Sequence, residues 1–253
     1  MTDTADSALV TLFCPSPNFE PRKGNRAPDL LLLHYTGMES AEGALAWLTT
    51  EESKVSCHYL VDEEGRITQM VREEARAWHA GVSHWAGEED INSCSIGIEI
   101  HNPGHELGYP DFPEEQMVAV EALCVDILQR HAIPPQRVLA HSDVAPGRKA
   151  DPGEKFDWRR LADAGVGLWV EPEPVDADTA FAAGEKGESV ATLQRDLQAL
   201  GYGIDESGVY DNATTNVVRA FQRHWRQIRI DGCADASTRE TVVKLLNALP
   251  STV

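Results

Sequence analysis

The feature that most constrains the fold is a run of four leucines with a polar tip. Residues 28–37 read PDLLLLHYTG, so four apolar side chains precede His34 without interruption. Successive side chains of a strand point to opposite faces of its sheet, and a strand with this pattern is therefore apolar on both faces. The run predicts a central strand in a sheet that is covered on both sides.

Further strand-like and helix-like segments follow the leucine run. Residues 55–71 read as a hairpin, and residues 94–102 and 137–143 read as two more short strands. Helical periodicity and end signals predict helices within residues 41–50 and 114–133. Strands mixed with helices in this way predict an α/β domain with a central mixed sheet flanked by helices.

The composition changes sharply near residues 167–189, where prolines, acids and small residues interrupt every hydrophobic period. We expect a first domain over residues 1–170, an acidic, proline-containing linker over 171–180 and a second unit over 181–253. Residues 1–170 carry 28 acidic and 14 basic side chains, whereas residues 181–253 carry nine and eight. The acidity of the chain therefore belongs to the first domain and the linker.

The second unit contains an internal repeat with helix-capping residues. The sequence GVYDNAT at residues 208–214 recurs 24 residues later as GCADAST at residues 232–238. A glycine suits the turn, and an aspartate or threonine caps the helix that follows. Apolar periodicity predicts a small all-α three-helix module, with helices over residues 187–200, 212–227 and 236–248.

The chain is strongly acidic, with 41 acidic and 22 basic side chains and a net charge of −19. Such a charge repels nucleic-acid phosphates and anionic membrane surfaces, so neither is an expected partner. No obligate protein partner is evident either. Three arginines share one face of the second predicted helix, and we interpret them as a solvated basic face rather than a binding site: Arg219, Arg223 and Arg226.

The cysteines and the N-terminus favour a reducing compartment. The five cysteines are odd in number, scattered and never spaced as CxxC, which argues against a disulfide framework or a cysteine zinc ribbon. No apolar run approaches the ~18 residues of a membrane span, and the N-terminus opens with acids rather than lysine or arginine. We expect a cytoplasmic protein. The alternative is a periplasmic one, if a leader is missing or Cys14 is lipidated.

Two histidines and one aspartate suit a catalytic zinc site. His34 follows the leucine run, His141 follows the apolar run RVLA, and Asp151 lies in the loop SDVAPGRKADPG. Two neutral imidazoles and a carboxylate leave a fourth position of a zinc ion open for water. Taken singly, each residue has a simpler interpretation, because strand-end histidines are often structural and DPG is often a turn.

Two further charged residues are candidates for catalysis. Glu99 interrupts the otherwise apolar strand SIGIEI, where an ionised carboxylate is costly unless it is paired or used chemically. Lys149, two residues before Asp151, could place an ammonium group near a developing oxyanion. The alternatives are an outward-facing glutamate on an alternating strand and a solvated lysine.

Five segments, taken in order, resemble the zinc-dependent N-acetylmuramoyl-L-alanine amidases of the type-2 family, which includes the peptidoglycan-recognition proteins. They are LLLHYTG, VSCHYLVDEEGRITQMV, RAWHAGVS, NSCSIGIEI and AHSDVAPGRKADPG. This resemblance covers residues 15–165. Residues 181–253 resemble the three-helix peptidoglycan-binding module of cell-wall hydrolases, in KGESVATLQRDLQALGY, GVYDNATT, AFQRHW and DGCADASTRE.

The resemblance implies a role for each of the five candidate residues. It implies that His34, His141 and Asp151 bind one zinc ion. It implies that Glu99 is the general base, and that Lys149 polarises the scissile carbonyl or stabilises the oxyanion.

Other motif residues match family positions in the substrate groove. Trp78, His79 and Asn92 are such positions, with packing as the alternative for Trp78 and a structural hydrogen bond as the alternative for the other two. His58 matches a histidine without a clear role, and we interpret it as structural.

The resemblance also implies an activity, the metal-dependent hydrolysis of the bond between N-acetylmuramic acid and L-alanine of peptidoglycan stem peptides. One branch of the family is a single-domain cytoplasmic enzyme that recycles 1,6-anhydro-muropeptides, and another is an exported, lipid-anchored enzyme with a binding module. The two-part architecture resembles the second branch, while the cysteines and the N-terminus favour the compartment of the first. We expect a recycling amidase that acts on anhydro-muropeptides. The alternatives are a periplasmic amidase that trims intact peptidoglycan, a non-catalytic recognition protein and a zinc hydrolase of another amide.

Overall fold

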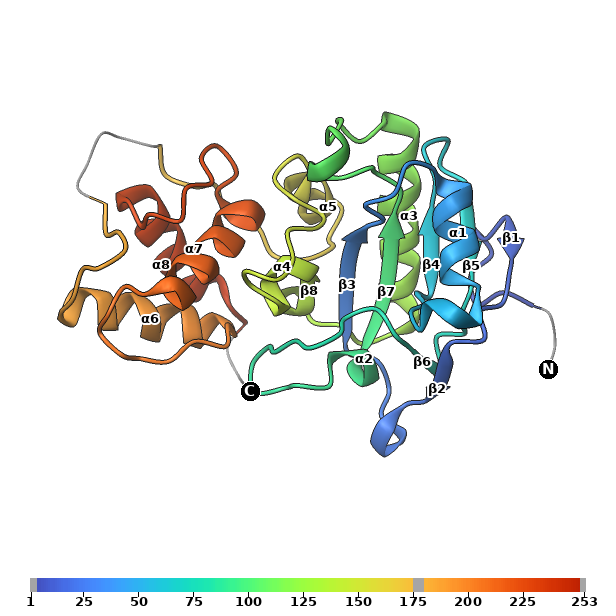
Figure 1. Cartoon of the computed structure of the whole chain (residues 1–253), viewed down its shortest axis with the longest axis horizontal. Helices are drawn as coiled ribbons and strands as arrows, with labels where there is room; N and C mark the ends of the chain where they lie inside the picture. The colour runs from blue at the N-terminus through green and yellow to red at the C-terminus, as the bar shows by residue number, and fades with distance from the viewer. Residues whose placement is uncertain (1–3, 175–179, 251–253) are drawn as a thin grey trace.

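The chain folds into an α/β part and a helical part that lie side by side (Figure 1). The computed structural model describes residues 4–174 and 180–250. Residues 175–179 of the expected linker lie outside this range. The α/β part contains the predicted mixed sheet with flanking helices. The helical part contains the three predicted helices.

The central sheet has six strands in the order β1-β5-β4-β7-β3-β8. Strands β4 and β5 pair antiparallel, as the predicted hairpin, and the other neighbours pair parallel. A separate antiparallel pair joins β2 (Phe19–Pro21) to β6 (Ala75–Ala77). In spatial order, the bounds of the six strands are Leu12–Phe13, Ile67–Gln69, Tyr59–Val61, Ser95–Ile100, Leu30–Tyr35 and Val138–Ala140.

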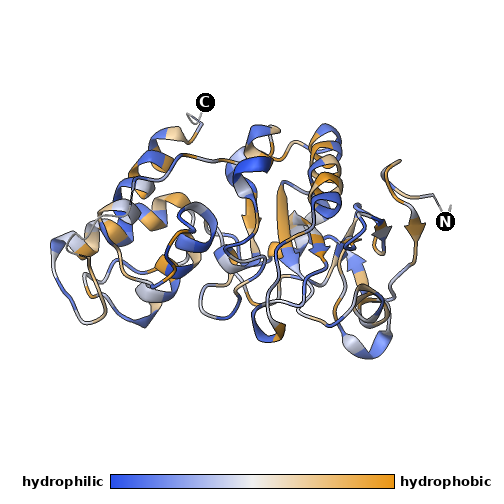
Figure 2. Cartoon of the chain, turned by 90° about the horizontal axis from the view of Figure 1, so that it is seen from above, coloured by the Kyte–Doolittle hydropathy of each residue, from blue (hydrophilic) through white to orange (hydrophobic). Residues whose placement is uncertain are grey.

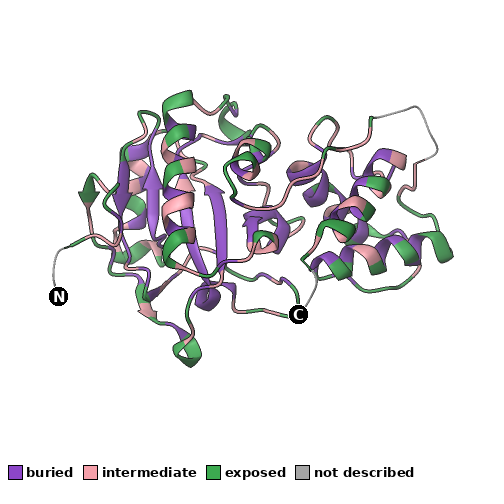
Figure 3. Ribbon diagram, turned by 180° about the vertical axis from the view of Figure 1, so that it is seen from behind, coloured by how far each residue is buried: buried purple, intermediate pink, exposed green. Residues whose placement is uncertain are grey.

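The two faces of the leucine run enter two different cores. Leu31 and Leu33 pack on the side of α3 (Glu114–Arg130), which buries Val120 and Leu123 against them. Leu30 and Leu32 belong to the other core, on the opposite face of the sheet. Figures 2 and 3 show the central strands as hydrophobic and buried. The prediction of a strand that is buried on both faces is therefore confirmed.

Shorter helices connect the strands and cover their edges. Helix α1 (Ala41–Leu48) begins at Ser40, whose hydroxyl accepts a hydrogen bond from the Gly43 amide. Its Leu48 packs on Leu60 of β4. The other helices of the first part are α2 (Ile91–Cys94), α4 (His141–Val144) and α5 (Trp158–Asp163), with 3₁₀ turns at Lys23–Asn25, Glu51–Ser53, His105–Leu107 and Pro135–Arg137.

The helical part follows the internal repeat closely. Asp211 and Asp235 occupy equivalent positions of the repeat, and each side chain accepts a hydrogen bond from the backbone amide three residues later. This cap explains why one helix begins directly after Asp211 and another directly after Asp235. The three helices are α6 (Glu188–Leu200), α7 (Asn212–Trp225) and α8 (Ala236–Ala248).

The expected solvated arginine face holds for Arg219, which is exposed, but is wrong for Arg226. Arg226 lies just beyond α7, is fully buried and pairs with Asp235 at 3.2 Å. Arg223 lies 3.8 Å from Glu154 of the first part, and Arg219 reaches the carbonyl of Asp231. Arg226 leaves the helical face because α7 ends at Trp225, which helical spacing alone does not reveal.

The two parts share one hydrophobic core. One buried cluster contains Leu30 and Leu32 of the sheet, Trp85 of the loop between β6 and α2, and Tyr202 and Phe221 of the helical part. The Trp85 and Tyr202 rings meet edge to face with centroids 5.0 Å apart. The helical part is therefore docked on the sheet rather than tethered beside it.

Two sequence-based expectations concern the cysteines and the length of the helices. The thiols of all five cysteines are free, as expected for a chain without a disulfide framework. Within residues 4–174 and 180–250, the helices are too short or too polar to cross a bilayer.

Candidate active site

The site forms at the edge of the sheet where its parallel strands end. His34 on β3 and Glu99 on β7 are direct partners in the strand register, so their side chains leave the same face of the sheet. His141 is the first residue of α4, directly after β8. These residues line a cavity of about 240 Å³ together with Lys149 and Asp151. The five predicted metal-binding and catalytic residues thus lie in one place.

Three atoms converge as a metal site requires. The Nδ1 atoms of His34 and His141 lie 2.8 Å apart, and Asp151 Oδ2 lies 3.2 Å from the first and 2.9 Å from the second. In a tetrahedral site with zinc–ligand bonds of ~2.0–2.1 Å, neighbouring ligand atoms are roughly 3.3 Å apart. The spacing therefore fits a small tetrahedral cation.

The outer nitrogens of both histidines have hydrogen-bond partners that set their tautomers. His141 Nε2 lies 3.0 Å from the carbonyl oxygen of Ala80, which only an N–H can approach favourably. His34 Nε2 lies 3.0 Å from His79 Nδ1, and His79 Nε2 lies 3.3 Å from Ser95 Oγ, whose hydroxyl donates to the Ile91 carbonyl. In the tautomers that satisfy these hydrogen bonds, Nδ1 of His34 and Nδ1 of His141 carry no proton. Two imidazole lone pairs and a carboxylate oxygen then face one point, which suits a cation.

Burial and charge keep His34 and Asp151 in the forms that bind a metal. Burial, with a smaller effect of His141, lowers the pKa of His34 to about 4. Burial alone would raise the pKa of Asp151, but His141 and His34 hold it well below its usual value. A neutral imidazole and an ionised carboxylate are the forms that coordinate zinc.

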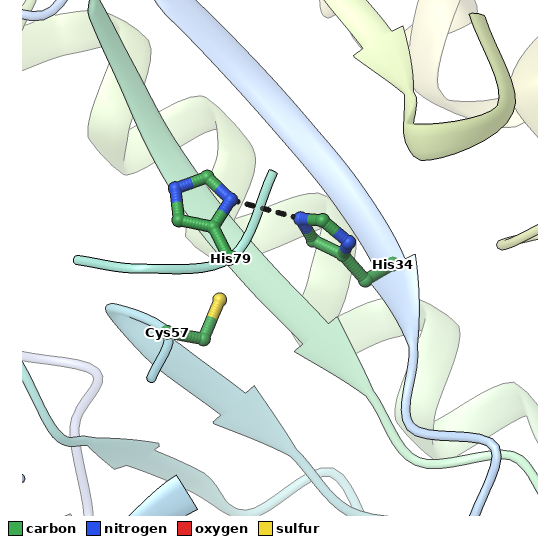
Figure 4. A group of neighbouring side chains, drawn as sticks. All are labelled: His34, Cys57 and His79. Carbon is green, nitrogen blue, oxygen red and sulfur yellow. Dashed lines mark hydrogen bonds between the residues drawn. The ribbon is translucent and has the colours of Figure 1, made fainter. Parts of the chain in front are cut away.

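A second group of possible metal ligands also includes His34, but it is less suited to a metal. His34, Cys57 and His79 lie together within the described part of the chain (Figure 4). Burial raises the pKa of the Cys57 thiol well above its usual value, so the sulfur stays protonated rather than a thiolate ligand. The group depends on Gly97, where a Cβ atom would lie 2.6 Å from His79 Nδ1 and 2.8 Å from Cys57 Sγ. Gly97 lets His79 approach His34 closely.

Glu99 has the properties of a group held for chemistry. Its Oε2 atom is buried and has no hydrogen-bond partner among the described residues. Burial, and then the negative charge of Asp151, raise the pKa of Glu99, while Lys149 acts in the opposite direction. A buried carboxylate without a partner is costly in a protein interior. Its place on the wall of the cavity explains why the chain keeps it.

The predicted substrate residues divide into two groups. Trp78 and His79 line the cavity. Asn92 does not line it: its Oδ1 atom accepts hydrogen bonds from the backbone amides of His79 (3.0 Å) and Ala80 (2.8 Å). Asn92 therefore holds this loop from behind. His58 accepts a hydrogen bond from the Gly97 amide at 2.9 Å, in agreement with the structural role expected for it.

Sequence reasoning missed an apolar wall of the cavity. Met38, Trp47 and Val55 are among the residues that line the same cavity as the two metal-facing histidines. Trp47 is 50% exposed, which is unusual for a tryptophan on a helix that packs on a sheet. The buried side chains of α1 are Ala41, Ala44 and Leu48, and Trp47 is not among them, which was a usable signal. The helical pattern could not show that Val55 lines the same cavity.

Profiles of two families match the chain in sequence order. The N-acetylmuramoyl-L-alanine amidase family matches residues 24–154. A peptidoglycan binding domain family matches residues 186–242. The first match contains the converging histidines and aspartate, and the second contains most of the helical part.

Individual relatives agree with these profiles. N-acetylmuramoyl-L-alanine amidase AmiD of Escherichia coli K12 is 36% identical in an alignment of 229 positions that covers 86% of this chain and 82% of the relative. The 1,6-anhydro-N-acetylmuramyl-L-alanine amidase AmpD of the same organism is 34% identical over 164 residues, 58% of this chain and 87% of the relative.

Solved structures lead to the same family. A complex of E. coli AmiD superposes with a TM-score of 0.76 at 33% identity and covers 90% of this chain and 92% of the other. AmpDH3 of Pseudomonas aeruginosa gives a TM-score of 0.74 at 31% identity and covers 89% and 94%. The chain therefore belongs to the N-acetylmuramoyl-L-alanine amidase family.

Proposed function

We propose that this chain hydrolyses the amide bond between N-acetylmuramic acid, in its 1,6-anhydro form, and L-alanine of peptidoglycan stem peptides, during cell-wall recycling. The observation that carries the proposal is the convergence of His34, His141 and Asp151 beside an unpartnered Glu99 in one cavity. The choice of substrate is supported by the similar proteins. AmiD was solved with anhydro-N-acetylmuramic acid-L-Ala-D-gamma-Glu-L-Lys, and AmpDH3 with an anhydromuramic pentapeptide.

We assign one zinc ion to His34 Nδ1, His141 Nδ1 and Asp151 Oδ2. The donor set of two neutral imidazoles and one carboxylate is typical of catalytic zinc, with one position open. A zinc ion held there would supply a Lewis acid, which lowers the pKa of water to ~7 and polarises a carbonyl. His79 and the Ala80 carbonyl hold the two imidazoles from outside and fix their orientation.

Glu99 and Lys149 carry the proton and charge steps of the reaction. Glu99 takes a proton from the attacking water and returns it to the amine of L-alanine as the C–N bond breaks. The Lys149 ammonium group stabilises the negative charge that develops on the scissile carbonyl oxygen. Water is the nucleophile, so no covalent enzyme intermediate forms. Trp78 and His79 contact the substrate, and Asn92 positions their loop.

We place the catalytic domain at residues 1–170, the linker at 171–180 and the helical module at 181–253. The five free thiols favour a cytoplasmic location, where soluble muropeptides rather than the intact wall are available. Soluble peptidoglycan fragments are then the partners of the site.

The proposal is tested by a paired digest with and without a metal chelator. The purified chain is incubated with 1,6-anhydro-N-acetylmuramyl tripeptide and, separately, with intact sacculi, and free stem peptide is measured by mass spectrometry. We expect release from the soluble compound, its loss after chelation and its return when Zn²⁺ is added. Comparable release from sacculi would favour an enzyme that trims the wall. No release from either substrate would contradict catalysis and favour a recognition protein.

The apolar wall gives a prediction about substrate affinity. Replacing Trp47 by alanine removes a half-exposed indole from the cavity, and we expect KM for the anhydro tripeptide to rise by about five- to tenfold, because contact with an aromatic ring contributes roughly 1–1.5 kcal/mol. The kcat should change less than twofold, since Trp47 offers no metal ligand and no acid–base group. Steady-state kinetics with Trp47→Phe as the control measures this, and an unchanged KM in Trp47→Ala would exclude a role for the wall.

A further inference from the structure

We infer that the helical module is a fixed part of the metal centre, because Tyr202 and His224 position the turn that carries His141 through the buried carboxylate of Asp143. The inference rests on the proposed metal-dependent function of this site. It makes Tyr202 and His224 positioning residues, since neither lines the cavity.

Asp143 connects the two parts of the chain at the metal site. It is the third residue of α4, whose first residue is His141. Its Oδ2 atom accepts hydrogen bonds from the Ala140 amide at 2.8 Å and from His224 Nδ1 at 2.6 Å. Its Oδ1 atom accepts the Tyr202 hydroxyl at 2.8 Å. One carboxylate therefore holds both the backbone immediately before His141 and two side chains of the module.

The module supplies most of what stabilises this carboxylate. Asp143 is fully buried, and His224 and Tyr202 are 2% and 1% exposed. A buried carboxylate needs several hydrogen-bond donors to offset its loss of water. Among residues 4–174 and 180–250, two of the three donors to Asp143 belong to the module, and without them the Ala140 amide is the one that remains. We expect the α4 turn to shift when these donors are removed, because Asp143 then has an unsatisfied buried charge.

The packing around His224 keeps its donor aimed at Asp143. Its ring stacks on Trp158 of the first part, with centroids 3.8 Å apart, and on Trp225, with centroids 3.6 Å apart. An imidazole between two indoles has little freedom to rotate. The link between the module and the α4 turn is therefore a rigid one.

Helix α7 also contacts the loop that joins His141 to Asp151. Gly147 lies between His141 and Asp151, and a Cβ atom there would be 2.3 Å from Asn216 Nδ2 of α7. The loop is closed at its ends by the Ser142 amide, which donates to the Asp151 carbonyl at 3.0 Å. The segment from His141 to Asp151 thus lies against α7, and it carries two proposed ligands and Lys149. This placement gives the module a role at the catalytic site, as a fixed wall rather than a mobile binding arm.

The test compares variants of the full chain in zinc affinity and in kinetics. Tyr202→Phe removes one donor and keeps the ring, His224→Leu removes the other, and His224→Asn restores an N–H near the position of Nδ1. Zinc affinity is measured by competition with a chromogenic chelator, and kcat and KM are measured on anhydro-N-acetylmuramyl tripeptide with saturating zinc. Gln227→Ala is the matched control, because Gln227 Nε2 donates to the Phe156 carbonyl at 2.7 Å across the same interface without reaching Asp143.

We expect zinc affinity to fall about tenfold in His224→Leu, severalfold in Tyr202→Phe, and to recover in His224→Asn, as for other outer partners of metal ligands. The kcat should fall with it, while KM stays within twofold and Gln227→Ala behaves like the wild type. Wild-type zinc affinity in Tyr202→Phe and in a folded His224→Leu would overturn the inference, as would an equal loss in Gln227→Ala. If His224→Leu fails to fold, Tyr202→Phe decides. Zinc affinity is read without substrate, so a wild-type chain that binds zinc and releases no peptide would refute the proposed function and leave this inference intact.

Discussion

Replacement of Glu99 by alanine is expected to lower kcat by about three orders of magnitude and to leave zinc bound. General acid–base catalysis contributes ~10²–10⁴-fold to a rate, and Glu99 is the group that we assign to move the proton between water and the leaving amine. Its side chain lies on β7 beside His34 but is not one of the three converging ligands. The measurement is kcat on the anhydro tripeptide together with the zinc content of the purified variant by mass spectrometry.

The control for this prediction is Glu99→Gln, which keeps the shape of the side chain and removes its basicity. Both variants should lose turnover to the same degree and hold one zinc ion per chain. Removal of a buried carboxylate without a hydrogen-bond partner also relieves a desolvation cost, so we expect Glu99→Gln to unfold at the same temperature as the wild type or higher. Loss of zinc from either variant would mean that Glu99 is a ligand and that the general base is another residue.

Replacement of His34 or Asp151 by alanine is expected to abolish both zinc retention and activity. Binding of structural zinc has an apparent free energy of ~10–16 kcal/mol shared among its ligands, so removal of one of three protein ligands should weaken binding by roughly 10²-fold or more. In the Asp151 variant the two facing imidazoles lose the only negative charge among the three ligands. Zinc content after dialysis, and activity after zinc is added back, measure the effect.

A matched histidine separates this effect from a general loss of stability. His105 lies near the same edge of the sheet, where its Nδ1 meets the Tyr35 hydroxyl at 3.0 Å and its Nε2 meets Glu154. It does not belong to either of the described groups that could hold a metal. We expect His105→Ala to keep its zinc. Equal zinc loss in this variant would show that the edge as a whole had been disturbed, and the assignment of His34 as a ligand would fail.

Local patterns allowed much of the fold to be predicted from the sequence. The leucine run placed β3 and its two buried faces, and the repeat placed the starts of α7 and α8 through Asp211 and Asp235. These features depend on side-chain alternation and on capping by the residue next to each helix, which involve only neighbours in the chain. The expected mixed sheet and three-helix module were confirmed for this reason.

The candidate site was predictable in composition but not in all its contacts. His34 lies near the end of β3, His141 follows β8 and Asp151 lies in the next loop. Parallel strands bring their ends to one edge of the sheet. The link from His79 to His34 and the position of Asn92 behind the loop could not be read in this way. They depend on the packing of segments that are distant in the sequence.

The sequence by itself determined the strands and helices, the caps and the residue types at the strand ends, because each depends on neighbours along the chain. Only the tertiary structure decided that the helical part docks on the sheet, that Arg226 is buried against Asp235, and that Asp143 takes donors from Tyr202 and His224. The physical reason is the length of chain between the partners. Asp143 and His224 are 81 residues apart, and no periodicity specifies which buried carboxylate a distant histidine will meet.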